Sequence, residues 1–441
     1  MSQKVPPAAA HDAAVARVIA HLESDARATL VNSPPGAGKS TLVRTVTQHF
    51  VGTDGPVPII TQTNDQADDH VRALRNLGLR TGRFHAVKIR PPRHDDNNVD
   101  LRRLQDCDVI VAPAAKWATL NAREIREWSP QLGIIDEAYQ MSSAALASVG
   151  DFHDRLLLVG DPGQLSPFTT ADRRLLQASS TWPLDTAAHT ILTWHPRSPR
   201  VELPVTWRLP APTAELVATA FYQQQFHSGI SADQRRLHSL GTIHDAYDQA
   251  IHAAAQHSIC LLELPDEHVA HTDPDMTTAI ATLITRLLTR RAVLIDGNQR
   301  QPLTARNIAV GVVHTTQRDR IAHAIDALAG TLGFNPGDIV VDTANRLQGR
   351  EFGVVIALHP LSGRRDATEF HIEAGRLCVL TSRHNTACIV VSRAGVQRQL
   401  DDYPHNRPVW LNAPMQPVDG WTANRTFLKR LQRLAHVSLR N

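Results

Sequence analysis

The sequence is poor in cysteine and has no long apolar run, and both absences exclude classes of protein. Its four cysteines show no CxxC spacing, so we expect buried thiols rather than a disulfide framework or a zinc site. No apolar run approaches the roughly 18 residues that a membrane-spanning helix needs, and the first residues lack a signal-peptide core. We therefore expect a soluble cytoplasmic protein.

An excess of charge of one sign is also lacking. The chain carries 46 Lys and Arg against 43 Asp and Glu, a formal net charge of +3 with His neutral. Bulk charge therefore gives no argument for a nucleic-acid partner, which would need a local basic surface. The 23 histidines are scattered, without Cys/His pairs or an HExxH helix, so surface and core histidines are expected.

Length and apolar patterning favour two domains. The chain has 441 residues, whereas single cores stop growing at about 250 to 300 residues. Short runs rich in Val, Ile and Leu recur between helical patterns, and their continuous apolar character is typical of parallel strands buried on both faces. The expected fold class is α/β, with mostly parallel sheets and helices on both faces. The expected strands are Ala28–Asn32, Val57–Thr63, Cys107–Ala112, Leu132–Ile135 and Leu156–Val159, then Ser258–Leu264, Ile308–His314, Ile339–Asp342, Val354–Leu358 and Cys388–Val391.

Proline marks the expected boundary between the domains. Five prolines stand between Pro196 and Pro212, a density that helix interiors and central strands do not tolerate. We place the first domain at residues 1–200 and the second at 201–412, which leaves 413–441 as a basic C-terminal helix. The helical pattern there runs over Asn424–Asn441. Its basic face either contacts nucleic acid or is solvated around a docked apolar stripe.

The segment Ser33–Thr41 (SPPGAGKST) follows an expected strand and opens an amphipathic helix. Glycines let backbone N–H groups close around phosphates, and a helix N-terminus favours their negative charge. The pattern GxxxxGK[ST] is met except at its first position, where Ser33 replaces Gly. We expect Lys39 to reach the β and γ oxygens of ATP, and the Ser40 hydroxyl to bind Mg²⁺. The residues expected to line the nucleotide are Pro35, Gly36, Ala37, Gly38, Lys39, Ser40 and Thr41.

Two carboxylates, Asp136 and Glu137, end a second apolar run. In α/β sheets the carboxyl ends of the strands form the ligand crevice. Asp136 is therefore suited to hold Mg²⁺, and Glu137 to orient and deprotonate the attacking water.

The segment Gly160–Pro167 (GDPGQLSP) is far more specific, because GDPxQLxP after a strand resembles motif III of superfamily 1 helicases. The resemblance is to the five-prime to three-prime branch that includes the nonsense-mediated-decay helicases. It implies two RecA-like P-loop NTPase domains and puts Gln164 where the family senses the γ-phosphate. A neutral amide can do this by hydrogen bonding without competing for Mg²⁺.

Three segments beyond the proline-rich boundary extend the resemblance. Trp207 and Arg208 are similar to the family's Tyr-Arg pair, in which the ring stacks on adenine and the arginine contacts the γ-phosphate. The segment DTANRLQGRE resembles motif V, which implies that Gly349 and Glu351 lie at the nucleotide. Alignment of RLCVLTSRH with motif VI puts Arg383 on the family's catalytic arginine, which stabilises charge on the γ-phosphoryl oxygens.

The same resemblance implies contacts to nucleic acid. Thr63 and Asn64 occupy the place of motif Ia, whose small polar side chains grip phosphates. Lys116 lies in VIVAPAAKW, which resembles the next element, and Thr343 of motif V approaches the nucleic-acid backbone.

Several positions depart from the family pattern. Cys378, Ser382, His384 and Asn385 depart from motif VI, whose second arginine is missing, which implies weaker nucleic-acid contact or coupling rather than lost hydrolysis. His11 stands where the family has its adenine-reading glutamine. Only about seventy residues separate motif Ia from Asp136, too few for the family's inserted β-barrel, so a reduced motor core is expected.

Two hypotheses of different class follow. The first is an ATP-dependent, Mg²⁺-dependent helicase or translocase that moves along single-stranded DNA or RNA. The second is an ATP-switched module that binds a protein partner and unwinds nothing. A small-molecule kinase is disfavoured by Gln164, QGRE and Arg383 together.

Overall fold

The computed structural model describes residues 6–53, 55–120, 124, 130–150, 153–165, 167, 185–231, 233–238, 241–269, 272–403 and 418–439. These residues form two compact units. Unit 1 runs to Pro162 and includes the described residues from 167 to Pro204, whereas unit 2 contains Gly163–Leu165 and the described residues from Val205 onward. We expected the boundary at residue 200, but the strand Arg200–Glu202 pairs with the sheet of unit 1. The second expected boundary, at 412, lies outside the described residues.

Unit 1 is built on a sheet of eight parallel strands in the order β4-β3-β5-β2-β6-β7-β1-β8. Five of these strands coincide with the apolar runs expected in the first half of the sequence. Each begins and ends within two residues of its run. The strands are β1 Ala28–Asn32, β2 Val57–Thr61, β3 Thr81–Phe84, β4 Asn97–Asn98, β5 Val109–Pro113, β6 Leu132–Asp136, β7 Arg155–Gly160 and β8 Arg200–Glu202.

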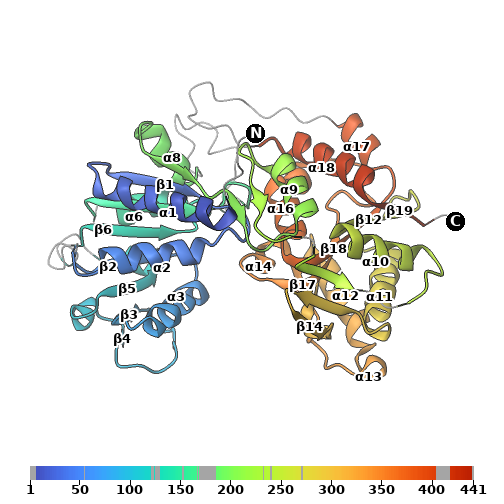
Figure 1. The fold of residues 1–441 in the computed structure, drawn as a ribbon, viewed down its shortest axis with the longest axis horizontal. Helices are drawn as coiled ribbons and strands as arrows, with labels where there is room; N and C mark the ends of the chain where they lie inside the picture. Colours follow the sequence, from blue (N-terminus) through green and yellow to red (C-terminus); the bar gives the residue numbers. More distant parts are fainter. Residues whose placement is uncertain are drawn as a thin grey trace. The chain divides into compact units, whose positions relative to one another are not determined.

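Helices cover both faces of this sheet (Figure 1). Successive strand residues point to opposite faces, so Val31 packs with one helix layer and Leu30 with the other. The first layer contains α1 Pro7–Glu23, α2 Lys39–Phe50 and α3 Asn64–Asn76. The second contains the 3₁₀ turn η1 Leu101–Leu104 and the helices α4 Ala114–Trp117, α6 Ser143–Val149 and α8 Ala187–Trp194.

Unit 2 has a six-stranded parallel sheet in the order β16-β15-β17-β18-β12-β19. A small antiparallel sheet, β11-β13-β14, and the short parallel pair β9-β10 complete its strands. The expected α/β class with mostly parallel sheets is therefore confirmed. The strands are β9 Val205–Thr206, β10 His227–Ser228, β11 Arg235–His238, β12 Ile259–Leu264, β13 Val293–Asp296, β14 Gln299–Pro302, β15 Ile308–Val312, β16 Val340–Thr343, β17 Phe352–Leu358, β18 His384–Arg393 and β19 His436–Ser438.

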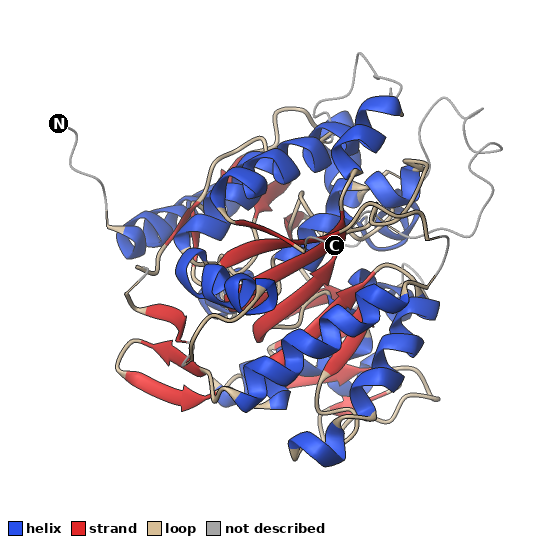
Figure 2. Cartoon of the chain, turned by 90° about the vertical axis from the view of Figure 1, so that its right-hand side faces the viewer, coloured by secondary structure: helices blue, strands red, loops and turns tan. Residues whose placement is uncertain are grey.

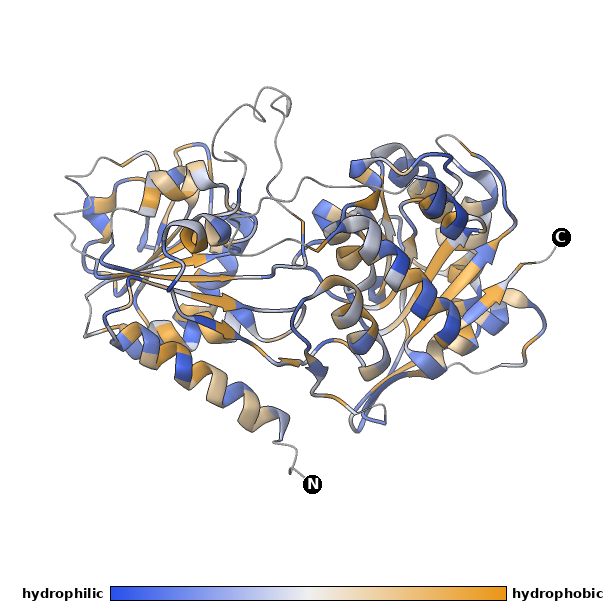
Figure 3. Cartoon of the chain, turned by 90° about the horizontal axis from the view of Figure 1, so that it is seen from above, coloured by the Kyte–Doolittle hydropathy of each residue, from blue (hydrophilic) through white to orange (hydrophobic). Residues whose placement is uncertain are grey.

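The large sheet of unit 2 also lies between two helix layers (Figure 2). Its strands are coloured mainly as apolar in Figure 3, whereas the helices carry both apolar and polar residues. Within the described residues, no helix is both long enough and apolar enough to cross a bilayer. The helices are α9 Ala211–Phe221, α10 Ala246–His257, α11 Pro274–Thr289, η3 Ala305–Asn307, α12 Thr315–Asp326, α13 Ala329–Leu332, α14 Ala344–Leu347, α15 Glu369–Ile372, α16 Ala374–Thr381, α17 Val396–Asp402 and α18 Gly420–Leu434.

The C-terminal helix differs from its expected extent. It begins at Gly420, after the capping residue Asp419, and ends at Leu434 instead of running to the C-terminus. His436–Ser438 form β19 because the backbone of β12 offers an open edge for pairing. The apolar stripe of α18 is buried in the core of unit 2, as the docked-helix alternative requires, and its basic residues are exposed.

Candidate functional site

The loop between β1 and α2 has the backbone of an anion site. Gly36 and Gly38 have φ values of 71° and 85°, in the left-handed region that side chains disfavour. Gly38 caps α2 without a side-chain hydrogen bond, so the first N–H groups of the helix stay open to a ligand. This loop is therefore shaped to bind phosphate.

Ser33 at the start of the loop has a structural explanation. Its N–H donates to the Gly160 carbonyl at 2.8 Å, which ties the loop to β7. Its φ is not positive, so this position does not require glycine. The side chain is 2% exposed, and its hydroxyl has no hydrogen-bond partner among the described residues.

Lys39, Asp136 and Glu137 come together beneath the loop. The Lys39 Nζ lies 3.4 Å from Asp136 Oδ1 and forms an ion pair with Glu137 Oε1. Burial alone would lower the pKa of Lys39, but the two carboxylates outweigh it and the pKa is raised. Burial would likewise raise the pKa of Asp136, but Lys39 and His70 bring it well below its usual value. At neutral pH the lysine is charged and Asp136 is ionised.

Glu137 adopts a strained backbone conformation. Its φ is 58°, in the left-handed region that costs a residue other than glycine of order 1 to 3 kcal/mol. Its N–H donates to Asp136 Oδ1 at 2.9 Å, and its buried Oε2 has no hydrogen-bond partner among the described residues. Such strain is often found at functional sites, where the surrounding structure holds a side chain in a required position.

His70 is a site residue that the sequence analysis missed. Its Nε2 lies 2.9 Å from Asp136 Oδ2, and the side chain is buried on α3. The remaining oxygen, Oδ1, faces Lys39 and the Glu137 amide. The one feature of the sequence that could have indicated His70 is its place on the apolar face of an amphipathic helix, between Ala67 and Leu74. That pattern alone is more typical of a core histidine.

Unit 2 brings Arg208, Glu351 and Arg383 to one place. Arg208 pairs with Glu351 Oε1 at 2.5 Å and donates to the Ser382 carbonyl at 3.4 Å. Arg383 donates to Ser382 Oγ at 2.9 Å and to the Val379 carbonyl at 3.2 Å. Arg383 is 1% exposed. The two predicted phosphate-contacting arginines thus both donate hydrogen bonds to Ser382.

His384, one of the residues that depart from motif VI, is turned into the core. It is fully buried, and its Nε2 lies 3.2 Å from Thr213 Oγ1. Burial, together with Arg208 and Arg383, lowers its pKa to about 3, so the ring is neutral. This side chain contributes no surface cation for a ligand.

Trp207 and the motif V turn lie on the same unit. The indole is 37% exposed, and Gly229 packs against it so closely that a Cβ there would lie 2.6 Å from the ring. Gly349 has a φ of 80° with open space where a Cβ would lie. Gln348 donates to Gln164 Oε1 at 2.7 Å, which connects motifs III and V within unit 2.

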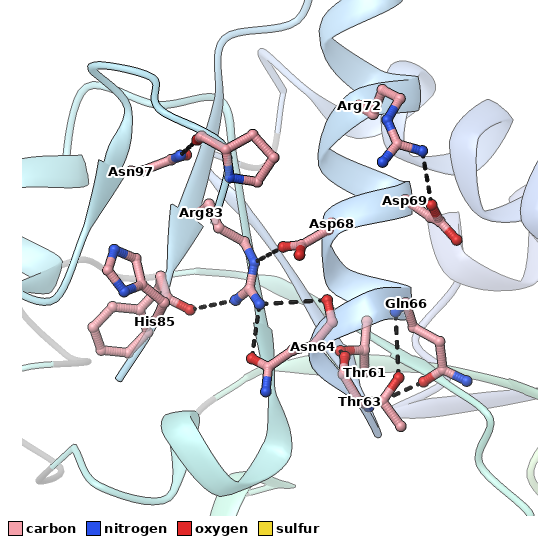
Figure 4. Close-up of polar contacts among 12 residues, drawn as sticks. Thr61, Thr63, Asn64, Gln66, Asp68, Asp69, Arg72, Arg83, His85 and Asn97 are labelled. Atoms are coloured by element: carbon pink, nitrogen blue, oxygen red, sulfur yellow. Dashed lines mark hydrogen bonds and ion pairs between the residues drawn. The ribbon is translucent and has the colours of Figure 1, made fainter. Parts of the chain in front are cut away.

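The predicted nucleic-acid residues of unit 1 follow neighbouring strands. Thr63 caps α3 with its side chain, and the Asn64 amide oxygen accepts from Arg83 at 2.8 Å (Figure 4). The ammonium of Lys116 donates to the Val99 carbonyl at 3.1 Å and lies 4.1 Å from the centre of the Phe84 ring. In unit 2, Thr343 ends β16 and is the N-cap residue of α14.

Comparisons with known proteins agree with these motifs. One AAA-domain family model matches residues 12–178 and a second matches residues 187–395, so that together they cover most of the chain. No curated protein matches the sequence.

Three of the solved structures that this chain is similar to have low identities and TM-scores below 0.5. The Arterivirus nonstructural protein 10 helicase is 14% identical with a TM-score of 0.45, over 84% of this chain and 61% of that one. The Escherichia coli DEAH/RHA helicase HrpB is 14% identical with a TM-score of 0.44, over 96% and 50%. S. cerevisiae Dbp5, bound to RNA and ADP BeF3, is 10% identical with a TM-score of 0.47, over 96% and 89%.

The chain thus spans about three fifths of the Arterivirus protein and half of the E. coli one. Its family assignment rests on the AAA-domain matches and on the ordered motifs from the phosphate loop to Arg383. The chain belongs to the AAA-domain P-loop NTPases, as a member of the superfamily 1 helicases.

Proposed function

We propose that this protein is a nucleic-acid-dependent ATPase that couples ATP hydrolysis to movement along single-stranded DNA or RNA. The observation that carries the proposal is the cluster of half-buried Lys39 with buried Asp136 and buried, strained Glu137 beneath the phosphate loop. The part of the proposal that concerns nucleic acid rests on membership of the superfamily 1 helicases. A cytoplasmic location belongs to the same proposal, and cell fractionation would test it.

In unit 1, ATP would bind with its phosphates on the loop and the N-terminus of α2. Lys39 would exchange its carboxylate partners for phosphate oxygens. The Ser40 hydroxyl and the Asp136 carboxylate, both hard oxygen donors, fit Mg²⁺, which would neutralise charge on the phosphates. Glu137, released from Lys39, would accept the proton of the attacking water.

In unit 2, Arg208 and Arg383 would supply positive charge to the γ-phosphoryl group. Arg208 would first have to leave Glu351, its partner at 2.5 Å. Trp207, covered on one side by Gly229, would stack on adenine with its exposed side.

The test is ATP hydrolysis with and without single-stranded DNA or RNA, followed by strand displacement on tailed substrates of both polarities. We expect either strand to stimulate hydrolysis. Glu137→Gln should keep ATP binding but lose roughly 10² to 10⁴ in rate, because the general base is removed. Normal hydrolysis by Glu137→Gln or Lys39→Ala would refute the site.

A second candidate is an ATP-switched module that acts on a protein partner. The sequence of motif VI favours it, because the neutral Asn385 stands where the family has its second arginine. ATP hydrolysis that ignores both DNA and RNA would favour this candidate over the first.

A further inference from the structure

A loop at the edge of the unit 1 sheet carries three exposed cations. It runs over residues 85–96, between β3 and β4. Lys88, Arg90 and Arg93 are exposed, and none of them has an ion-pair partner among the described residues. Asp96 lies 3.5 Å from Arg80, so part of the loop's negative charge is already compensated. The loop therefore offers a surplus of positive charge to solvent.

The base of this loop is anchored. The Arg83 N–H donates to the Asp96 carbonyl at 2.8 Å, and the His85 N–H donates to the Asn98 carbonyl at 3.1 Å. Arg75 of α3 donates to Asn97 Oδ1 at 2.8 Å. Both ends of the loop are thus fixed to the sheet, and its cations project from a defined place.

Strand order places this loop beside the predicted phosphate contacts. β3 pairs with β5 and β5 pairs with β2, all parallel, so the segments after these strands leave the same edge as neighbours. The segment after β2 carries Thr63 and Asn64, and the segment after β5 carries Lys116. Lys116 lies over the ring of Phe84, the last residue before the loop. The loop cations therefore follow the predicted phosphate contacts along the same edge of the sheet, an arrangement that begins at Thr63.

Arg83 links the loop's base to Asn64. Its guanidinium is 1% exposed and reaches Asp68 Oδ1 at 2.6 Å, the Phe84 carbonyl at 2.7 Å and Asn64 Oδ1 at 2.8 Å (Figure 4). A guanidinium only donates, so the amide oxygen of Asn64 must face it and the Asn64 NH₂ group is left as a donor. The Asn64 NH₂ group and the exposed cations of the loop thus lie on one edge of the sheet, where they could donate hydrogen bonds and supply positive charge to phosphate oxygens.

We infer that the loop at residues 85–96 binds backbone phosphates of a single-stranded nucleic acid, through Lys88, Arg90 and Arg93. This rests on the proposed function and adds a contact surface that the family motifs do not include. Phosphate contacts carry no sequence information, so the loop increases affinity and salt sensitivity without base preference.

The test compares two triple variants in the full chain. The first is Lys88→Gln, Arg90→Gln and Arg93→Gln. The control is Arg17→Gln, Arg27→Gln and Arg197→Gln, which removes three exposed arginines elsewhere on unit 1 that also have no ion-pair partner among the described residues. Binding to a labelled oligothymidylate and to oligouridylate is measured from 50 to 300 mM salt, with ATP-analogue binding as a check on folding.

We expect the loop variant to bind both strands roughly tenfold to a hundredfold more weakly at 0.1 M salt. Its plot of log affinity against log salt should be less steep by about 2, because each lost contact to a single strand changes the slope by about 0.7. The control variant should match the native chain in its affinity and in the slope of its salt dependence. The inference would be overturned if the two variants had equal affinities and equal slopes, whether both matched the native chain or both bound more weakly. If the native chain binds neither strand, the proposed function itself fails.

Discussion

At the scale of single residues, the site is organised by side chains that hold other side chains. His70 fixes one oxygen of Asp136, and Arg83 fixes the amide of Asn64. Neither was predicted, because a histidine or arginine in an amphipathic pattern has no local signature of its partner. Lys39 and Asp136 were predicted, because their role follows from short motifs whose geometry is local to one loop and one strand end. Contacts between residues far apart in sequence need the fold.

His70→Ala should weaken the magnesium-dependent part of nucleotide binding. Loss of the hydrogen bond leaves a buried charged oxygen without its partner, which costs about 1 to 3 kcal/mol, or roughly a fivefold to hundredfold loss. The side chain of His70→Asn can still donate a hydrogen bond to Asp136, so this variant should recover part of the lost nucleotide affinity. The measurement is the affinity of an ATP analogue with Mg²⁺ and with EDTA. A loss that is equal in both conditions would mean that His70 supports only the fold.

Asn64→Ala should weaken nucleic-acid binding and leave nucleotide binding unchanged. The substitution removes the NH₂ donor that Arg83 orients, and one phosphate contact is worth less than tenfold at moderate salt. Filter binding of a single-stranded oligonucleotide would measure the change. A comparable loss of ATP affinity would show that Asn64 acts on the fold instead.

At the scale of elements, most strands of the two large sheets were predictable, but the shortest edge strands were not. The runs at Ala28–Asn32 and Leu132–Ile135 are apolar because both faces are covered, and this signal is strong. β4, β8 and β19 have two or three residues each and take their structure from a neighbouring strand. Such short segments have little pattern of their own, so tertiary pairing decides them.

Close approach between elements gives a sharper prediction at Gly375 of α16. A Cβ there would lie 2.4 Å from the Gln164 carbonyl oxygen, which is backbone and has little freedom to move. Gly375→Ala should displace residues 163–165 and abolish the stimulation of ATP hydrolysis by nucleic acid. Steady-state hydrolysis at saturating strand is the measurement.

Gly330→Ala on α13 is the matched control for that experiment. It places a methyl group in open space within a helix and should stabilise the chain by about 0.5 to 1 kcal/mol. If both variants keep full stimulation, residues 163–165 do not need the Gly375 contact.

At the scale of the whole molecule, buried neutral histidines in both units link stability to pH. Burial lowers the pKa of His153 and His359 to about 4, and burial with neighbouring arginines lowers that of His384 to about 3. An unfolded histidine titrates near 6.5, so below that pH the unfolded chain binds protons that the folded chain does not.

Stability should therefore fall as the pH drops from about 6.5 toward 4, by about 1.4 kcal/mol per pH unit for each such histidine. Urea unfolding at pH 7.5, 6.5 and 5.5 would show it. His359→Phe, which cannot take up a proton, should make the decline less steep. A decline as steep as that of the native chain would exclude His359 as a contributor.

The ion pairs of Lys39 have a consequence for how this site can change over time. Lys39 is a cation beside two buried carboxylates, so its loss would destabilise the folded chain as well as stop hydrolysis. A descendant that no longer needed ATP hydrolysis would still be selected to keep the lysine. Glu137 is under the opposite pressure, because its left-handed backbone would be relaxed by glycine or asparagine. In relatives of this chain, a glutamate at that position is the better sign of a working ATPase.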